Sequence, residues 1–565
     1  MNIIGVNVGS RSSACLIQNE ALTYFNQEER LSRIKNDSGI PYLCLEEIKQ
    51  IETDIDILFV TGYNYNYSSG NSVLNLLNKT GFSIKEWFGY HKSHHLVHAA
   101  KAVNDSKFED ALILVQDGHG SSFYLSDGHE TVETTSVYSY SKKTGFECLY
   151  KTLFSYHHTA LDKKIPQDIR VMLEQEHEQM FLFDKSPLYK NTVFDVINTF
   201  DLGFLYMITG QCCGFTDEGG KLMGLQSYGM LDSTVPEVLV DGKINMDVFC
   251  LNQHDKHRNT FNLKKYPQLH DQQSKINFSY KVQRAFEKKQ YTLIKEYLNK
   301  TGHTNLILTG GTALNVVSNY NLKKSLLDTI DMFVEPLCGD EGNSIGVCNL
   351  FLLEKNIRTD FSMYSCGIEP DYKYKLLDNE TEQTVDDRYV ANLIADGNIV
   401  SYFQGKAEAG PRALGNRSIL FNPTIKDGKD IVNTVKGREF FRPFACSILE
   451  EAAHEWFDLA NMSNSPNMMY AVDSIASAEL IPSVIHVDGT CRVQTVDAYQ
   501  NKNYYNLIKE FFDITNIPLL FNTSFNIAGD PIVHTINDAL DTIRKSKIEY
   551  LYLPDKNKLI YCKNL

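Results

Sequence analysis

Residues 404–445 read QGKAEAGPRALGNRSILFNPTIKDGKDIVNTVKGREFFRPFA, and this stretch decides how the C-terminal third of the chain is interpreted. The whole 565-residue chain has a net charge of −15, yet here four acidic residues stand among eight basic ones: Lys406, Arg412, Arg417, Lys426, Lys429, Lys436, Arg438 and Arg442. Gly410, Pro411 and Gly415 predict tight turns around two of the arginines. Guanidinium groups held in turns can form paired, charge-assisted hydrogen bonds to phosphate oxygens. The stretch therefore predicts an anion site, the alternative being a basic surface loop.

Two downstream segments predict more polar groups for the same site. HVDGTCRVQTV (486–496) alternates as a strand, so that one face carries His486, Asp488, Thr490, Arg492 and Gln494. IPLLF (517–521) predicts a buried strand that runs directly into the polar residues Asn522, Thr523, Ser524 and Asn526. Either segment alone is compatible with an ordinary polar turn, but beside the arginines both favour a small anionic ligand.

The N-terminal part opens with short β-type runs at 3–8, 13–18 and 21–25, and Gly9 lies at the first turn. Further on, NLILTGGTALNVVSNYNL (305–322) predicts a strand, a turn at Gly310 and Gly311, and a helix start whose amides can hold a nucleotide. Asn315 follows closely enough to face the same ligand. A glycine pair alone is equally typical of a structural turn.

A candidate metal site comes from HKSHHLVHAAKAV (91–103), in which His94 and His98 share one face of a helix. Asp117 ends the buried-type strand LILVQ, and Asp340 lies in a later GDEG motif. Two imidazoles and two carboxylates suit Fe(II), Mn(II) or Zn(II), and the ligand types do not choose among them. The alternative interpretation is a pair of hydrogen-bonded core histidines.

The motifs GPRALGNRS, VNTVKGREFFRPFA, HVDGTCRVQTV and NTSFN strongly resemble the NodU/CmcH/TobZ family of O-carbamoyltransferases, and the resemblance extends from about Gly5 to Leu553. It implies an α/β chain in which an N-terminal actin-like ATPase (TsaD-like) domain, residues 1–366, precedes a C-terminal YrdC-like α/β domain, residues 367–565. A shift to polar, Gly- and Pro-containing sequence at 360–385 marks the boundary. Residues 121–210 and 231–290 are interpreted as elaborations around an acceptor pocket.

The resemblance implies an ATP-dependent O-carbamoyltransferase (EC 2.1.3 class) in which the YrdC-like domain makes carbamoyl adenylate from carbamoyl phosphate and ATP. The actin-like domain then passes the carbamoyl group to a hydroxyl of a small acceptor, such as a sugar, an aminocyclitol or a nucleoside. The resemblance favours iron over manganese or zinc as the metal, and ATP is expected to enter with Mg²⁺.

The expected roles group the candidate residues as follows. The catalytic set of the basic stretch is Arg412, Lys436, Arg438, Arg442 and Arg492, and the set expected to bind carbamoyl phosphate and ATP is Lys406, Arg417, Asn522, Ser524 and Asn526. QEERLSRIKN (27–36) and EGGKLMGLQSYG (218–229) are similar to family motifs, which adds two lysines to an adenylate-binding set of Lys35, Lys221, Gly310, Gly311 and Asn315. The expected metal ligands are His94, His98, Asp117 and Asp340.

One departure from the family pattern lies at the first turn. The family usually has a His-Asp pair there, close to the acceptor, whereas this chain has Ser10 and Arg11. The imidazole that could take the acceptor proton is absent, so either another base serves or the acceptor differs.

The composition of the chain indicates its cellular compartment and its classes of partner. Twelve cysteines occur without a CxxC pair, which fits a reducing cytoplasm better than a disulfide framework or a zinc knuckle. No apolar run approaches the ~18 residues of a membrane span, and the acidic balance disfavours nucleic acid as a partner. A homo-oligomer is compatible with the sequence.

Three other functions share features with this sequence. A HypF-like enzyme should carry paired CxxC zinc fingers, which are not seen, and a tRNA-modifying TsaD/YrdC-type enzyme would need a basic RNA-binding face. The third rival is a non-transferring, nucleotide-binding actin-like protein, for which the change at Ser10 and Arg11 could mark lost activity.

Overall fold

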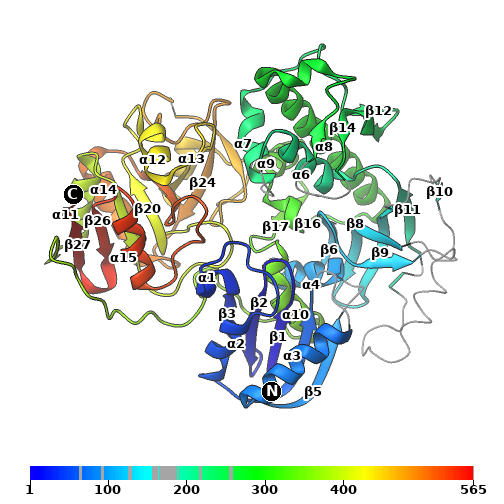
Figure 1. Cartoon of the computed structure of the whole chain (residues 1–565), viewed down its shortest axis with the longest axis horizontal. Coiled ribbons are helices and arrows are strands. Elements are labelled where there is room, and N and C mark those ends of the chain that lie inside the picture. The colour runs from blue at the N-terminus through cyan, green and yellow to red at the C-terminus, as the bar shows by residue number, and fades with distance from the viewer. Residues whose placement is uncertain are drawn as a thin grey trace. The chain divides into compact units, whose positions relative to one another are not determined.

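The computed structural model describes the chain except for residues 63–66, 91–93, 125–129, 156–162, 165–187, 190, 216–218, 253–258, 327, 477 and 564–565 (Figure 1). The chain forms two compact units. The first unit comprises residues 1–25 and 38–361, and the second comprises 26–37 and 362–565. Residues 26–37, here called the crossing segment, therefore pack with a part of the chain that lies more than 300 positions further on.

The first unit begins with a five-stranded sheet in the order β3-β2-β1-β4-β5. Its strands are β1 (Asn2–Asn7), β2 (Ser13–Gln18), β3 (Ala21–Gln27), β4 (Asp54–Thr61) and β5 (Ser83–Tyr90). Strand β1 runs antiparallel to β2 and parallel to β4, and β4 runs parallel to β5. Residues 3–7 are all buried, so both faces of β1 are covered, as is typical of a central strand.

A second sheet repeats this plan with the order β9-β8-β6-β16-β17. Its core strands are β6 (Asp110–Gln116), β8 (Glu130–Ser141), β9 (Gly145–Ser155), β16 (Asn305–Thr309) and β17 (Asp331–Val334). Strand β6 pairs antiparallel with β8 and parallel with β16, and β16 pairs parallel with β17, as β1, β2, β4 and β5 do in the first sheet. Short strands β7 (Ser122–Tyr124), β10 (Lys163–Lys164) and β11 (Val193–Ile197) extend it. Two halves with the same strand plan are the arrangement of an actin-like ATPase fold, which confirms the predicted fold class.

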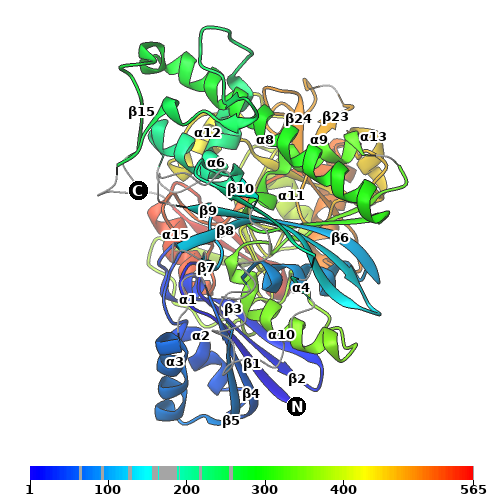
Figure 2. The same cartoon turned by 90° about the vertical axis from the view of Figure 1, so that its right-hand side faces the viewer.

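Helices connect and cover the two sheets (Figures 1 and 2). They are α2 (Tyr42–Lys49), α3 (Tyr67–Thr80), α4 (His94–Ser106), α6 (Leu202–Cys212), α7 (Gly219–Leu225), α8 (Gln272–Thr301), α9 (Val316–Ser325) and α10 (Asn343–Glu354). The last helix of each half packs on the sheet of the other half, because α4 contacts β6, β8 and β16, whereas α10 contacts β1, β2 and β4. The two helices also pack against each other, so the halves share one core.

The stretches expected to elaborate the acceptor pocket fall partly outside the described residues. Their described parts include two small hairpins, β12 (Leu239–Val240) with β13 (Lys243–Ile244), and β14 (Phe249–Cys250) with β15 (Thr260–Phe261). Within the described part of the chain, none of the helices has the length and apolar character needed to cross a bilayer.

The second unit is built on a ten-stranded mixed sheet. In sheet order its strands are β18 (Glu380–Thr384), β27 (Lys558–Cys562), β26 (Tyr550–Leu553), β19 (Val400–Phe403), β20 (Arg417–Phe421), β25 (Leu519–Ser524), β21 (Ala445–Leu449), β24 (Thr490–Val496), β23 (Ala471–Ser474) and β22 (Phe457–Asp458). Its helices are α11 (Asp387–Ala395), α12 (Gly428–Lys436), α13 (Ala453–Trp456), α14 (Lys502–Thr515) and α15 (Ile536–Lys545), with α1 (Glu28–Ser32) supplied by the crossing segment.

Successive residues of a strand belong to two different apolar layers in this unit. Tyr402 and Leu420 belong to the layer covered by α11 and α14, whereas the adjacent Phe403 and Ile419 belong to the layer covered by α15. This alternation follows from the two-residue repeat of a strand. The unit is therefore an α/β sandwich, consistent with the fold class predicted for the C-terminal domain.

Candidate functional site

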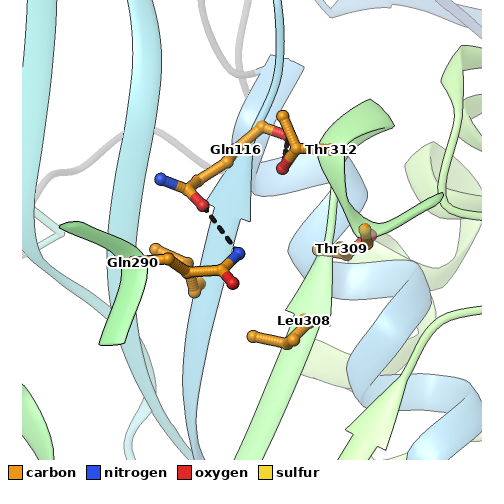
Figure 3. A pocket seen from close by; sticks show the side chains of 7 residues that line it. Gln116, Gln290, Leu308, Thr309 and Thr312 are labelled. Carbon is orange, nitrogen blue, oxygen red and sulfur yellow. Dashed lines mark hydrogen bonds between the residues drawn. The ribbon is translucent and has the colours of Figure 1, made fainter. Parts of the chain in front are cut away.

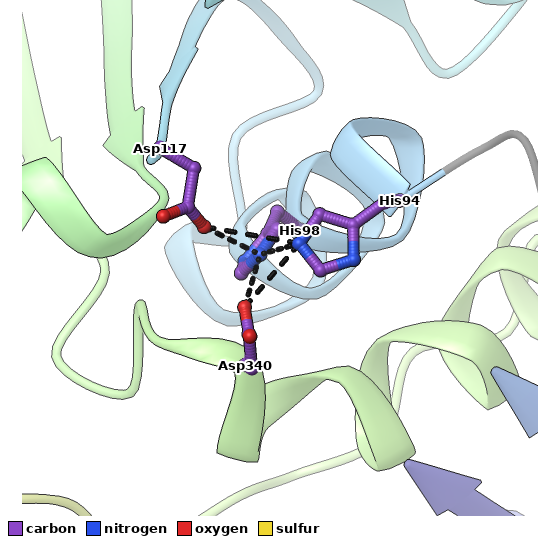
Figure 4. A group of neighbouring side chains, drawn as sticks. All are labelled: His94, His98, Asp117 and Asp340. Atoms are coloured by element: carbon purple, nitrogen blue, oxygen red, sulfur yellow. Dashed lines mark hydrogen bonds and ion pairs between the residues drawn. The ribbon is translucent and has the colours of Figure 1, made fainter. Parts of the chain in front are cut away.

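Two imidazoles and two carboxylates converge within the first unit (Figure 4). His94 begins α4 and His98 follows one turn later, so their Nε2 atoms lie 3.1 Å apart. Asp117 directly follows β6, and its Oδ2 lies 3.5 Å from the Nε2 of His98. Asp340 opens the short helix η5 (Asp340–Gly342), and its Oδ1 lies 3.3 Å from the Nε2 of His94. The structure thus brings together the four residues that the sequence predicts as metal ligands.

The charges of this cluster stabilise one another. Burial lowers the pKa of His94, but the carboxylates of Asp340 and Asp117 outweigh it and raise the pKa to about 10. Burial raises the pKa of Asp340, but His94 and His98 outweigh it and lower the pKa to about 2. Opposite charges at this distance favour both charged forms.

The cluster fits a divalent metal ion. Ligand bonds of about 2.1 Å place neighbouring donor atoms about 3.0–3.4 Å apart in octahedral or tetrahedral geometry, and one donor atom from each of the four residues lies within 4.8 Å of the others. The Oδ2 of Asp117 is buried and accepts no hydrogen bond. A cation held by these residues would satisfy it, and two nitrogens with two oxygens suit Fe(II), Mn(II) or Zn(II).

A buried ion pair fixes the first turn of α4. The carboxylate of Glu133 accepts hydrogen bonds from the backbone N–H groups of His95 (3.2 Å) and Ser121 (3.0 Å), and Lys151 donates to its other oxygen. The hydroxyl of Ser121 in turn accepts from the backbone N–H of His94 at 3.1 Å. The site thus depends on two charged residues, Glu133 and Lys151, that the sequence reasoning did not single out.

A second buried pair ties α4 to the loop before Asp340. Lys101, one turn beyond His98, donates to Glu335 at 2.8 Å and to Asp105 at 2.6 Å. Glu335 follows β17 and also accepts from the backbone of Leu337 at 3.0 Å. The lysine therefore links the helix that carries the imidazoles to the segment that delivers a carboxylate.

The predicted glycine turn lies against the end of β6. Gly310 has a φ of 86°, and a Cβ there would lie 2.3 Å from the carbonyl oxygen of Gln116. A Cβ on Gly311 would lie 3.0 Å from Oδ1 of Asp117, so the turn borders the carboxylate of the cluster. Thr312 donates to the Gln116 carbonyl and Gln290 donates to its side chain, in a small pocket behind the turn (Figure 3).

A separate basic cluster forms within the second unit, where α12 ends beside β25. The ammonium of Lys436 donates to the backbone and hydroxyl oxygens of Ser524 and, at 3.0 Å, to Oδ1 of Asn526. Arg438 donates to the hydroxyl of Ser524 at 3.2 Å. Burial lowers the pKa of Lys436 well below its usual value, and the nearby charges of Arg438 and Arg442 lower it further.

Arg492 on β24 belongs to the same cluster. Burial lowers its pKa well below the usual value, and the charges of Arg412, Arg438 and Arg442 add to the shift. Its Nε is buried without a hydrogen-bond partner. Positive groups that lower one another's pKa are typical of a site that binds an anion.

Family models describe both halves of the sequence. The model for the carbamoyltransferase N-terminus matches residues 58–348, and the model for the carbamoyltransferase C-terminus matches residues 391–558. The chain belongs to the carbamoyltransferase family.

Curated relatives of this carbamoyltransferase include two nodulation proteins. It is 28% identical to nodulation protein NolNO of Sinorhizobium fredii, over 95% of this chain and 77% of that protein. It is 32% identical to nodulation protein NolO of Bradyrhizobium diazoefficiens, over 63% of this chain and 68% of that protein. The solved structure of full-length HypF in a phosphate- and nucleotide-bound form matches 62% of this chain and 55% of its own, with 14% identity and a TM-score of 0.37.

Two residues predicted to bind ligands have structural roles in this carbamoyltransferase. Arg417 is buried and directs all its N–H groups to backbone carbonyls, among them Gln404, Gly405 and His534, so none is left for a phosphate. Asn315 caps α9 by accepting from the backbone of Ser318 at 3.1 Å. The predicted phosphate contact of Arg417 is therefore wrong, whereas the ligand role of Asn315 stays a prediction.

The remaining predicted residues are distributed between the units. Asn522 is buried and donates to the carbonyl of Ala413 at 3.1 Å, beside Arg412, and Lys406 lies half-buried after β19. Lys221 lies in α7, near the ring of Phe215. Lys35, predicted to bind adenylate in the first domain, is exposed in the crossing segment of the second unit, where its charge contributes to lowering the pKa of Lys436.

Proposed function

We propose that this carbamoyltransferase is an ATP-dependent enzyme of the cytoplasm that works in two stages. Carbamoyl phosphate and ATP give carbamoyl adenylate at the basic cluster, and the carbamoyl group then passes to a hydroxyl of a small acceptor at the His-Asp cluster. The observation that carries the proposal is the presence of two chemically different sites, one of clustered cations and one of paired imidazoles and carboxylates, each formed within one compact unit. Family membership supports the carbamoyl group as the one transferred.

Activation needs positive charge. In the proposed first stage, carbamoyl phosphate takes up water and releases phosphate to leave carbamate, whose oxygen attacks the α-phosphorus of ATP and displaces pyrophosphate. Negative charge builds on the phosphoryl oxygens as the bonds change. Arg412, Arg438, Arg442 and Arg492 would neutralise it, and Lys436 would hold the loop at Ser524 in place.

Transfer needs an oriented adenylate. In the proposed second stage, the acceptor oxygen attacks the carbamoyl carbon, AMP leaves, and the hydroxyl proton passes to a base. His94, His98, Asp117 and Asp340 would hold a divalent metal ion, for which iron is the expected identity, and the ion would act as a Lewis acid. The backbone at Gly311 would approach the ligand closely because no side chain intervenes.

The first test is the stoichiometry of activation. Pyrophosphate release should require carbamoyl phosphate and ATP together and should be absent with either alone. Release of ADP as the sole nucleotide product would overturn the proposal, because it would place the attack at the γ-phosphorus.

The second test separates the two stages. Asp340→Ala should leave pyrophosphate formation running while carbamoylated product is lost, with carbamoyl adenylate accumulating or hydrolysing. Equal loss of both activities in a folded variant would contradict the division between the sites.

The acceptor is open to direct identification. Mass spectrometry of sugars, aminocyclitols and nucleosides incubated with enzyme, ATP and carbamoyl phosphate should show a gain of one carbamoyl group on one class. Failure of every hydroxyl acceptor, with adenylate formation intact, would argue against O-carbamoylation.

A further inference from the structure

The crossing segment packs beside a turn that carries part of the basic cluster, although the two are far apart in sequence. Gly410 occupies the left-handed region with a φ of 78°, two residues before Arg412. The side-chain oxygen of Gln27 accepts from the backbone N–H of Gly410 at 2.9 Å. The guanidinium of Arg30 donates to the carbonyl of Gly410 at 2.6 Å. Both polar backbone groups of this one glycine are therefore held by the crossing segment.

The side chains that make these contacts are buried. The Arg30 side chain is 0% exposed and Gln27 is buried at 4%, so each hydrogen bond forms away from solvent. Burying a guanidinium is costly unless its polar groups find partners, and Arg30 donates to the Gly410 carbonyl and lies 3.9 Å from a carboxylate oxygen of Glu29. Leaving either group of Gly410 without its partner would cost the desolvation of a buried polar group. The turn is thus held in one conformation.

The residues that follow Gly410 are held by Glu408 of the basic stretch and by Asn522 of β25. Glu408 accepts from the backbone N–H of Leu414 at 2.7 Å, and Asn522 donates to the carbonyl of Ala413. Arg412 therefore lies between two sets of backbone contacts, one made by Glu408 and Asn522 and one made by residues 26–37. Its charge reaches Arg492 and contributes to the low pKa of that residue.

The crossing segment also contacts the second loop of the cluster. Arg33 donates to the carbonyls of Ile532 (2.7 Å) and Pro531 (3.0 Å). That loop begins at Asn526, which accepts from Lys436 and donates to the carbonyl of Asp530. One short segment thus supports both loops from which the basic cluster is built.

We propose that Gln27 and Arg30 are positioning residues of the basic cluster, which fix the Gly410 turn so that Arg412 meets the phosphate groups of the ligand. The inference rests on the proposed function, because it takes that cluster to be the phosphate-binding site. Residues 26–37 belong to the N-terminal part of the sequence, which otherwise forms the proposed transfer site, but this inference gives them a role in activation.

The test measures binding of inorganic pyrophosphate to the full-length protein by titration calorimetry, without turnover. Arg30→Met and Arg412→Ala should each weaken binding roughly ten- to hundredfold, the range for a hydrogen bond to a charged group. If Arg30 acts through Arg412, the double variant should bind no more weakly than Arg412→Ala alone, to within about a factor of two. Arg30→Lys, which keeps one donor for the Gly410 carbonyl, should recover part of the loss.

Arg544→Met is the matched control. Arg544 also makes structural bonds within the second unit, donating to Glu380 at 2.7 Å and to the Lys375 carbonyl at 3.0 Å, but it does not contact either basic loop. This variant should bind pyrophosphate as wild type does. Should Arg30→Met fail to fold, Gln27→Ala removes the acceptor for the Gly410 N–H alone and takes its place in the double-variant comparison.

The outcomes distinguish a failure of the proposed function from a failure of the positioning role. If the wild type does not bind pyrophosphate, the basic cluster is not an anion site and the proposed function fails with it. If the wild type binds, and the losses from Arg30→Met and Arg412→Ala multiply in the double variant, only the positioning role is overturned. The same holds if Arg544→Met weakens binding as much as Arg30→Met.

Discussion

The His-Asp cluster and the basic cluster are both buried groups of charges, but they are stabilised in opposite ways. In the first, burial and pairing compete and pairing prevails, so the pKa of His94 rises to about 10 and that of Asp340 falls to about 2. In the second, burial and mutual repulsion act in the same direction, so the pKa values of Lys436 and Arg492 both fall. The first cluster balances its own charge, whereas the second depends on a ligand to do so.

Because of this difference, the two clusters should respond differently to the loss of one side chain. Removing a ligand from the balanced cluster leaves a buried charge without its partner, which is costly. Removing one cation from the basic cluster relieves repulsion in the free protein and weakens only the complex with an anion. Stability should therefore suffer more from changes in the first cluster, and substrate use more selectively from changes in the second.

The largest effect is expected from His94→Ala combined with His98→Ala. Metal content should fall from about one ion per chain to none, and transfer should drop by roughly a thousandfold or more, since a Lewis acid contributes several kcal/mol. Elemental analysis of the purified protein measures the first and product formation the second. His303→Ala, which removes a partly exposed histidine of the same unit, is the control. Unchanged metal content in the double variant would refute the site.

The next effect concerns Arg442, which is half-buried and pairs with Glu439 at 3.2 Å. Arg442→Ala should cost about 2–4 kcal/mol of transition-state stabilisation in activation, or roughly 30- to 1000-fold in rate. Supplied with preformed carbamoyl adenylate, the variant should carbamoylate the acceptor almost as fast as wild type. Arg388→Ala, at an exposed ion pair in the same unit, should leave both stages unaffected. Loss of transfer from preformed adenylate would mean that the sites are not separate.

A smaller effect concerns the stability of the second unit in acid. Burial lowers the pKa of His534 in the second unit to about 3, and the charges of Arg417 and Arg30 lower it further. Because the unfolded chain takes up this proton below about pH 6.5 and the folded chain does not, the unfolding free energy should fall as pH decreases from there towards 3. The expected contribution is about 1.4 kcal/mol per pH unit.

The chain offers a reporter for this measurement, because it has two tryptophans, Trp87 in the first unit and Trp456 in the second. In a Trp87→Phe background, urea unfolding followed by the fluorescence of Trp456 should show a shallower pH dependence for His534→Gln than for the parent. Identical slopes between pH 4 and 6 would show that His534 is not buried in its neutral form.

The smallest effect is expected at the first turn, where Ser10 is exposed and the neighbouring Arg11 pairs with Glu341 at 3.4 Å. Ser10→His should change the transfer rate by roughly three- to tenfold, less than a fully positioned base contributes. Pyrophosphate formation should not change, and Ser10→Ala should not reproduce the effect. An equal change in both stages would place this turn in activation as well.

The sequence predicted best what depends on local spacing. His94 and His98 share a helix face because they are four residues apart, and Asp117 lies at a strand end where polar residues gather, so their convergence could be anticipated. Asn315 also carries a local signal for its capping role, since an Asn at the start of a helix is a common N-cap. The fold class followed from family motifs and was confirmed.

What the sequence did not reveal depends on distant partners. Lys151 meets Glu133 because of the pairing of β8 and β9, and this register is not visible in either strand alone. In the sequence Arg417 resembles a ligand-binding arginine, but in the structure it donates to the backbone carbonyl of His534, a distant residue. The charges of the crossing segment are typical of a solvated helix start, and only contacts made hundreds of residues later show that Arg30 is buried.

The exchange of helices between the two halves of the first unit has a consequence for protein synthesis. Strands β1, β2 and β4 leave the ribosome early, but α10, which packs on them, starts only at Asn343. At typical elongation rates of 5–20 residues per second, the apolar face of this sheet stays exposed for roughly 15 to 60 s before α10 is synthesised. The nascent chain should therefore be a client of ribosome-associated chaperones over this interval, and chains truncated before residue 343 should aggregate rather than fold.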